Sequence, residues 1–459
     1  MRGRGWMIAA IAFLAACVLL GGASAAGAAA NALLQASALG LIVALLWRRD
    51  FTVPAEARPL LWIGGAFLLV GLLSLVPLPA SLWSGLPFRD QVLAGFRLIG
   101  VDDPSIPLSL TPQATLASLL ALLPPAAMFL VVLQLRAEER RRLPLALLAL
   151  AAASIVLGAF QLLGGPDSPL RFYAITNPTS PVGFFANANH EATLLLCALP
   201  FAAFLAGRTA TRRSRSKRSG GAIISVAVAV FLMAGIAISG SSAGYGLFIP
   251  TAIASLLIYR RSVAGRVSPG WAAGLALFLI VFAAAALRGP LSTVAFSGDL
   301  SAHPSSRRIL ATTTSEAVRD SLPVGTGLGS FASVYRRYED PNRVTRQYAN
   351  HAHNDYLEFV LELGVAGLLL MLAFIAWWVR ALLRVWRRDF SGAALARAGS
   401  VVIGIVLLHS IVDYPVRTAA VAAVAALACA LLVPPAGRRD EEGAAEAAEG
   451  EELRHLEAA

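Results

Sequence analysis

The sequence predicts an all-α polytopic membrane protein with about twelve transmembrane helices. Of its 459 residues, 57% are hydrophobic and only 14% are charged, whereas a soluble domain is about half apolar and a quarter charged. Many of the apolar runs approach the roughly 20 residues that cross a bilayer. Short arginine clusters separate these runs, so the net charge of +11 indicates membrane topology rather than a surface for nucleic acid.

The apolar runs define the expected spans in order. If Met1 is inside, the richest arginine clusters all face the same side, which predicts that both termini are cytoplasmic. Cleavage of the first run as a signal peptide is an open alternative that would not reverse the later spans. We expect one membrane domain, residues 1–437, and a disordered acidic tail, residues 438–459. The expected spans are 7–26, 28–47, 59–79, 114–135, 143–164, 189–207, 222–240, 243–259, 270–287, 357–379, 398–413 and 417–435.

Three segments are expected on the outer side. Residues 80–112 are rich in proline and aromatic residues, which favours short interfacial helices and turns. Residues 165–189 are rich in proline and glycine. The large loop, 288–356, lies between the ninth and tenth spans and contains a helical stretch at 305–321 and the glycines Gly325, Gly327 and Gly329. No strand precedes these glycines, so they predict a tight turn back to the membrane rather than a nucleotide-binding loop.

The stretch His351-Ala352-His353-Asn354-Asp355-Tyr356-Leu357-Glu358 closes the large loop and leads into an apolar run. Polar groups at a membrane boundary are a functional-site candidate by default. A neutral imidazole is suited to take a proton from a hydroxyl, so we expect one histidine to be a general base and the other to be structural. Asp355 or Glu358 is expected to orient the histidine that acts as the base. The local sequence lacks the further ligands that a zinc site needs.

Arginines in the large loop predict an anionic ligand, because a guanidinium binds phosphate oxygens bidentately and keeps its charge. They are Arg288, Arg307, Arg308, Arg319, Arg336, Arg337, Arg343 and Arg346. Farther along, His409 and Asp413 lie four residues apart near the end of a span, either as a structural pair or as catalytic groups. The three cysteines, Cys17, Cys197 and Cys429, lie in apolar runs and predict neither a disulfide nor a thiolate metal site.

Taken together, these motifs resemble the O-antigen ligase and polysaccharide polymerase superfamily. The most specific are Gly-x-Gly-x-Gly-Ser-Phe at 325–331 and His-x-His-Asn-Asp-Tyr-Leu-Glu at 351–358. Supporting matches lie at 108–115, at 183–190, at Arg307 and Arg308 ahead of Pro323, and at 409–417. The resemblance extends over about residues 75–420.

The resemblance implies a GT-C-like, inverting glycosyltransferase of the bacterial inner membrane with its active site on the periplasmic face. It implies an undecaprenyl-diphosphate-linked saccharide donor, a glycan, lipid A-core or lipid-linked acceptor, and no cofactor, nucleotide or metal. His353 is then the expected base, with His351 and Asp355 as further catalytic residues, and Arg308 or Arg307 is the first clamp on the diphosphate. The other substrate-binding candidates are Arg288, Arg319, Asn187, Asn189, His190, His409, Asp413 and Arg417.

Two positions depart from the family pattern. Relatives carry arginine where this chain has Ala188, and Ser-Arg-Gly where it has Ser242 and Ala243. The clamp would then draw on Arg288, Arg171, Arg319 or Arg417. Whether the chain is a polymerase or a ligase stays open, with residues 410–417 favouring an exopolysaccharide polymerase. A transporter or flippase of lipid-linked saccharide is the alternative, although the two halves are not alike. A noncatalytic assembly partner is a third hypothesis.

Overall fold

The computed structural model describes residues 2–24, 28–211, 215–263, 307–344 and 348–435, and within these it shows a helical bundle with a two-stranded sheet. Seven helical segments in the described ranges are long and apolar enough to cross a membrane, and four shorter apolar helices accompany them. The architecture is that of a polytopic membrane protein. The expected span at 270–287, the first part of the large loop and the tail at 438–459 lie outside the described residues.

The N-terminal part contains three apolar helices and a small hairpin. The second helix matches the expected span at 28–47, whereas the first begins and ends about five residues before the expected 7–26, and the third ends at Leu73, before residue 79. The hairpin pairs β1 with β2 in antiparallel register, Pro77 opposite Pro107. The elements are α1 (Arg2–Leu20), α2 (Ala28–Leu46), η1 (Ala55–Ala57), α3 (Arg58–Leu73), β1 (Pro77–Leu78), α4 (Ala80–Trp83), α5 (Asp90–Leu98) and β2 (Ile106–Pro107).

The fourth expected span is divided into two helices, α6 (Pro112–Leu120) and α7 (Leu123–Leu133). Pro124 lies in the first turn of α7, and a proline is tolerated there because the first amides of a helix have no intrahelical partner. After α7 come α8 (Ala137–Arg140) and α9 (Leu143–Leu163).

Helix α10 (Ala188–Ala210) is the centre of the bundle. Its most apolar stretch is 83% buried, against 11% in the segment that contains α3. It packs against α9, α18 (Ala393–His409), α11 (Arg215–Ile238) and α12 (Ser242–Ser262). Side chains at the start of α10 are therefore enclosed by several other helices.

The described part of the large loop forms a small cluster beside the bundle. Its elements are α15 (Arg307–Ser321), α16 (Phe331–Tyr335) and η2 (Pro341–Arg343). Leu310, Ala317, Phe331 and Tyr335 are buried together in it, and α15 packs on α17 (Asp355–Arg387). The chain closes with η3 (Pro415–Arg417) and α19 (Ala419–Leu431).

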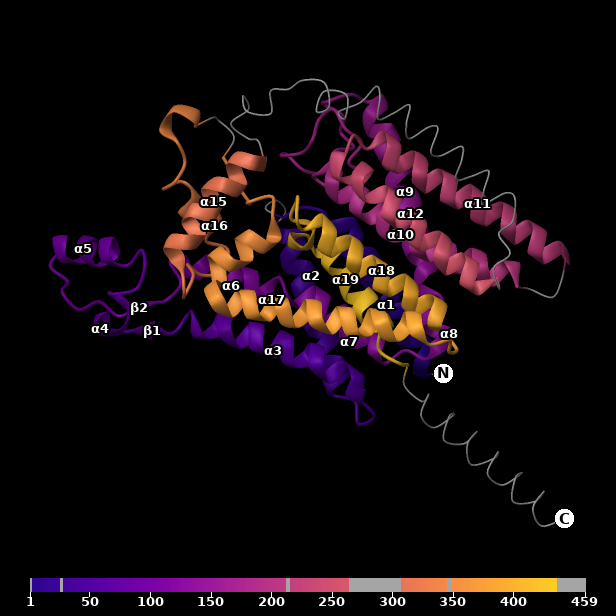
Figure 1. The fold of residues 1–459 in the computed structure, drawn as a ribbon, viewed down its shortest axis with the longest axis horizontal. Helices are drawn as coiled ribbons and strands as arrows, with labels where there is room; N and C mark the ends of the chain where they lie inside the picture. Colours follow the sequence, from indigo (N-terminus) through magenta and orange to yellow (C-terminus); the bar gives the residue numbers. More distant parts are fainter. Residues whose placement is uncertain (1, 25–27, 212–214, 264–306, 345–347, 436–459) are drawn as a thin grey trace, which may run out of the picture.

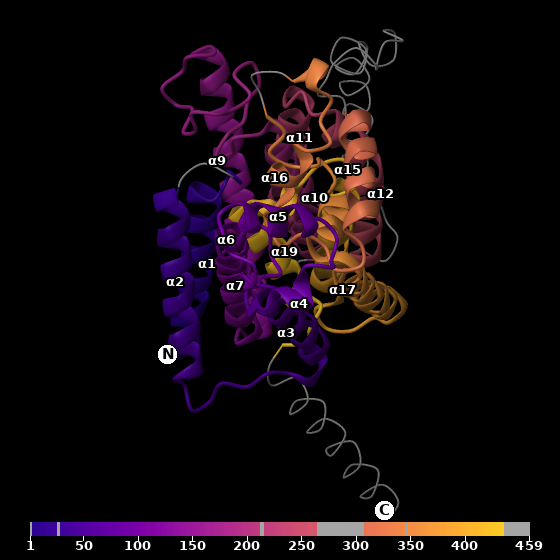
Figure 2. The ribbon, with the colours of Figure 1, turned by 90° about the vertical axis from the view of Figure 1, so that its left-hand side faces the viewer.

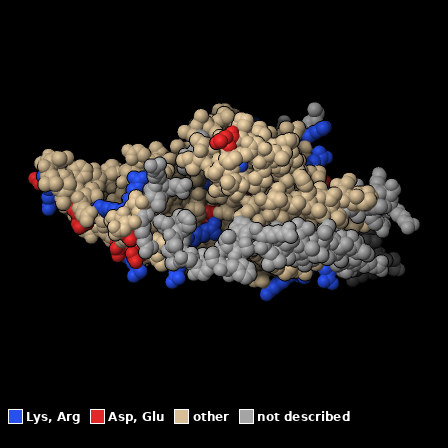
Figure 3. All heavy atoms as spheres, turned by 90° about the horizontal axis from the view of Figure 1, so that it is seen from above, with Lys and Arg blue, Asp and Glu red and all other residues tan. Residues whose placement is uncertain are grey.

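We call the end of the bundle that carries α15 and α16 the site end (Figure 1). Helix α3 ends there, and α10, α12 and α17 begin there. Seen from this end, α1 and α2 lie on one side of the bundle and α17 on the other (Figure 2). On the face shown in Figure 3, charged side chains lie toward both ends of the molecule, and the described flank between them is largely uncharged. This distribution fits helices whose flanks face lipid.

Candidate active site

The histidine motif forms an irregular stretch directly before α17. Asn354 caps the helix, because its Oδ1 accepts a hydrogen bond from the Leu357 amide at 3.0 Å. His353 has a φ of 49°, a left-handed conformation that few residues other than glycine adopt. Such a conformation costs about 1–3 kcal/mol and persists only where surrounding contacts hold it. The contacts that hold His353 come from the far end of the sequence.

Asp413 is the residue that holds His353. Its Oδ1 lies 2.9 Å from His353 Nδ1, although 60 residues separate the two in the sequence. A carboxylate only accepts hydrogen bonds, so His353 carries its proton on Nδ1 and its Nε2 is left with a lone pair. Among the described residues, no side chain or backbone group bonds to this Nε2. The pair therefore has the arrangement of a general base with its orienting carboxylate.

Asp413 follows the end of α18, in a turn, and its side chain is 0% exposed. It accepts hydrogen bonds from Asn189 Nδ2 and from the Tyr414 amide, and Arg307 Nη2 lies 3.9 Å from its Oδ2. Burial alone would raise the pKa of Asp413. The hydrogen bond from His353 and the neighbouring imidazoles outweigh burial and hold that pKa well below its usual range, so Asp413 is anionic at neutral pH.

The second histidine belongs to a separate ionic network. His351 Nδ1 lies 2.7 Å from Glu358 Oε1, and the Ala352 amide donates to the other oxygen at 2.8 Å. Glu358, not Asp355, is thus the carboxylate that binds His351. Neither of them orients the expected base, since His353 is bound to Asp413 instead.

Arg417 joins this network through three carboxylates. Its guanidinium lies 3.3 Å from Glu358, 3.1 Å from Glu362 and 3.4 Å from Asp355. Asp355 also accepts a hydrogen bond from Ser410 Oγ at 2.8 Å. Because three buried carboxyl groups already surround this cation, its binding capacity is taken up by the protein itself.

The start of α10 also contributes polar side chains to the site. Asn187 caps the helix by accepting from the Asn189 amide at 2.8 Å. Asn189 bridges Asp413 and Ser241, whose Oγ donates to Asn189 Oδ1 at 2.7 Å. His190 is 1% exposed, and neither of its ring nitrogens has a partner in the described part of the chain. The motif at 183–190 thus reaches the histidines through Asn189.

The expected side-chain pair between His409 and Asp413 is not formed. His409 Nδ1 instead lies 2.7 Å from Thr193 Oγ1. Asp413 contacts His409 through the backbone, where the Asp413 amide donates to the His409 carbonyl oxygen at 2.9 Å. The helix ends at His409, so the four-residue spacing does not place both side chains on one helical face. His409 is completely buried.

The candidate arginines are placed very differently from one another. Arg307 begins α15 and reaches Asp413, with 42% of its side chain exposed. Arg308 is its exposed neighbour. Arg319 lies on the same helix, roughly 18 Å farther along its axis. Arg171 donates to the backbone oxygens of Asn177 and Ser180 at 2.9 and 3.0 Å, which holds its own loop together. Arg288 lies outside the described residues.

The glycine-rich turn has a structural role, as expected. Gly325, Gly327 and Gly329 all have positive φ. The turn pairs with α17 where that helix is interrupted at Gly364, through the Gly327 amide and Glu362 oxygen at 2.8 Å. A Cβ on Gly325 would lie 2.6 Å from the Gly364 nitrogen. The turn also positions Glu362, whose Oε1 accepts from the Gly329 amide at 2.8 Å.

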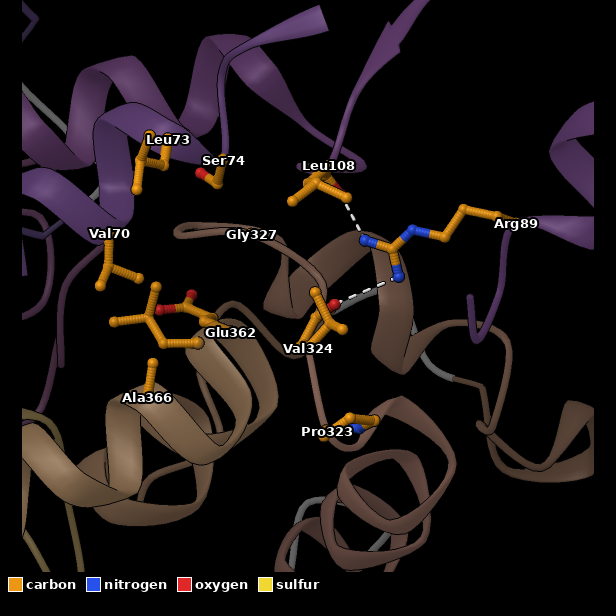
Figure 4. Close-up of a pocket in the computed structure, with 12 residues that line it drawn as sticks. Val70, Leu73, Ser74, Arg89, Leu108, Pro323, Val324, Gly327, Glu362 and Ala366 are labelled. Carbon is orange, nitrogen blue, oxygen red and sulfur yellow. Dashed lines mark hydrogen bonds between the residues drawn. The ribbon is translucent and has the colours of Figure 1, made fainter. Parts of the chain in front are cut away.

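Arg89 is a buried residue that the sequence did not single out. It lines a cavity of 220 Å³ between α3, α17 and the glycine-rich turn (Figure 4). Its guanidinium donates to the backbone oxygens of Leu108 and Gly325 (Figure 4), and it is 1% exposed. Nothing in the local sequence around Arg89 indicates that the folded chain buries this arginine against backbone carbonyl groups.

Neither the ionic network nor the histidine pair forms a metal site: the described ranges contain no group of three histidine, cysteine or acidic side chains placed to hold a metal ion.

Residues 227–372 match a family model described as O-antigen ligase. No curated protein matches the chain. The matched range includes Arg307, His351 and His353, whereas Asn189 and Asp413 lie outside it and are added by the geometry. Residues 227–372, about a third of the chain, are thus similar to the O-antigen ligase family, which agrees with the motifs and with the helical membrane fold.

Proposed function

We propose that this protein is an inverting membrane glycosyltransferase that needs no metal and ligates or polymerises surface polysaccharide. It acts on undecaprenyl-diphosphate-linked saccharides at the periplasmic face of the inner membrane, and both of its termini are cytoplasmic. The observation that carries the proposal is the His353–Asp413 pair with Arg307 3.9 Å from the same carboxylate. It combines a base for a hydroxyl with a cation for an anionic leaving group.

The reaction proceeds by attack of an acceptor hydroxyl on the anomeric carbon of the donor. The bond between that carbon and the diphosphate oxygen breaks, and the diphosphate leaves with the electron pair. His353 Nε2 takes the hydroxyl proton, and Asp413 stabilises the resulting imidazolium. Attack from the face opposite the diphosphate inverts the configuration at the anomeric carbon.

Arg307 is the described arginine best placed to offset charge on the diphosphate, because it is near the base and 42% exposed. Arg308 is its neighbour, and Arg288 remains a candidate. Arg417 and Arg171 are engaged within the protein, and Arg319 is remote. The clamp is therefore assigned to the beginning of α15, which compensates for the family arginines absent at Ala188 and Ser242.

His351 and Asp355 hold the site in place rather than transfer protons. His351 is bound to Glu358, and Asp355 is bound to Ser410 and Arg417. Asn187, Asn189 and His190 support the site from α10, with Asn189 bound directly to Asp413.

The test is a deletion strain in which lipid-linked intermediates and surface polysaccharide are extracted and compared. Single lipid-linked repeats that accumulate without long chains would identify a polymerase. Long lipid-linked chains that never reach an acceptor would identify a ligase. Both pools must return to normal when the intact gene is restored. If neither pool changes on deletion, the proposed function is wrong.

A further inference from the structure

Tyr414 lies at the centre of the candidate site, yet the proposed proton transfer does not use it. Its ring centroid lies 4.3 Å from that of His351, 4.8 Å from that of His353 and 5.1 Å from that of His190. The residue is 6% exposed. Imidazoles from the start of α10 and from the stretch before α17 thus meet on a single aromatic ring.

The backbone of Tyr414 is fixed independently of its side chain. Its amide donates at 3.0 Å to Asp413 Oδ1, the same oxygen that accepts from His353. Asn350 Nδ2 donates to the Tyr414 hydroxyl at 3.4 Å. Burial and the charge of Asp413 raise the pKa of Tyr414, so the ring remains a neutral phenol. Substitution of the side chain alone would leave the amide bond to Asp413 available.

The hydrogen bond to Asp413 does not by itself orient the His353 ring. A bond through Nδ1 fixes one point, and the imidazole can still pivot about the line that joins this atom to the carboxylate. The Tyr414 ring meets the His353 ring at 70°, an edge-to-face contact that aromatic pairs prefer. This contact removes the remaining freedom and so determines where Nε2 points.

We propose that Tyr414 is a positioning residue whose ring sets the imidazole plane of His353 and so directs Nε2 at the acceptor hydroxyl. The inference rests on the proposed function and deepens it. Displacing a reacting group by about 1 Å can cost roughly 100-fold in rate, so loss of the ring is expected to be far more harmful than loss of the hydroxyl.

The experiment compares Tyr414→Phe, which keeps the ring, with Tyr414→Leu, which removes it. The matched control is Tyr335→Leu: Tyr335 is 3% exposed and stacks on Phe331 at 5.2 Å in the large-loop cluster. The full chain is labelled at histidine and reconstituted in lipid nanodiscs. NMR then reports the ring-current shift and the ring tautomer of His353, assigned with His353→Ala; the chain has only six histidines.

Transfer from an extracted lipid-linked saccharide fraction is measured on the same samples. We expect Tyr414→Phe to retain the His353 signals and to lose roughly threefold in rate, the effect of one neutral hydrogen bond. Tyr414→Leu should lose the ring-current shift and roughly 10- to 100-fold in rate. Tyr335→Leu should retain the His353 signals. If Tyr414→Leu does not accumulate in membranes, Tyr414→Met takes its place.

Unchanged His353 signals and a normal rate in the variant without a ring would overturn the proposal. Equal losses in Tyr414→Phe and Tyr414→Leu would also overturn it, because the hydroxyl and not the ring would then matter. The NMR signals need no substrate, so they separate this inference from the proposed function. Absence of transfer by the wild-type protein would count against the proposed function, and a fully active His353→Ala would remove His353 as the base. An inactive His353→Ala with a normal Tyr414→Leu would remove only the role of Tyr414.

Discussion

Replacing Asp413 by asparagine tests the orientation of the base with almost no change in volume. All the neighbours of this carboxylate are donors: His353 Nδ1 and the Tyr414 amide at Oδ1, and Asn189 Nδ2 and Arg307 at Oδ2. An amide offers only one accepting oxygen. If that oxygen faces His353, the new NH₂ group faces the donors of Asn189 and Arg307.

If the amide turns over, its NH₂ group faces His353 instead. The imidazole must then accept on Nδ1 and carry its proton on Nε2, so it can no longer act as a base. The same change in a serine protease lowers kcat about 10⁴-fold through the wrong tautomer. Leaving buried donors unpaired adds about 1–3 kcal/mol of destabilisation. We expect Asp413→Asn to lower the transfer rate roughly 10²- to 10⁴-fold.

The assay is transfer of lipid-linked saccharide by protein purified into nanodiscs, with Asp102→Asn, an exposed carboxylate, as the control. Thermal unfolding provides a second measurement, because the direction in which the stabilisation by Asp413 changes with pH is known. The folded pKa of Asp413 is lowered, so its stabilisation is present above the unfolded value of about 3.9 and is lost as the pH falls below it. The wild-type advantage in Tm should therefore be constant from about pH 5 to 8. A normal rate for Asp413→Asn beside an inactive His353→Ala would refute the orienting role.

Three further substitutions test other parts of the site. Arg307→Ala should lower transfer roughly 10- to 100-fold by weakening contact with the leaving group, whereas Arg319→Ala should stay near wild type in the same assay. Arg417→Gln leaves three buried carboxylates without their cation and should cost about 3–5 kcal/mol, measured as a lower Tm; an unchanged Tm would contradict the network. Gly325→Ala should lower Tm more than Gly100→Ala, because both have positive φ but only the first Cβ would clash.

Local patterns predicted several of the helices closely, because a membrane span consists of contiguous apolar residues. The apolar runs at 28–47 and 143–164 correspond to α2 and α9 within a residue or two. The division of the fourth span was missed, although Pro124 and Pro125 marked it. The end of α18 at His409 was also missed, since the apolar residues Ile411 and Val412 continue the pattern beyond it and the next proline is Pro415.

The candidate site could be predicted only in part. The histidine motif and the arginines at the start of α15 were found because each is a short cluster. The link between His353 and Asp413 was not found, because it joins two chain segments that only the packing of α17 beside α18 brings together. Hydrogen bonds between Asn189 and Asp413, or Arg89 and Gly325, likewise depend on packing and leave no periodic signal.

The assignment of His353 as the base is tested most directly by measuring transfer by purified protein that carries His353→Ala, compared with His351→Ala. Both variants remove one imidazole from the same stretch and one contact with Tyr414. We expect His353→Ala to be inserted in the membrane but to form no product, and His351→Ala to retain measurable transfer. Full transfer by His353→Ala would contradict the assignment of the base and the mechanism built on it.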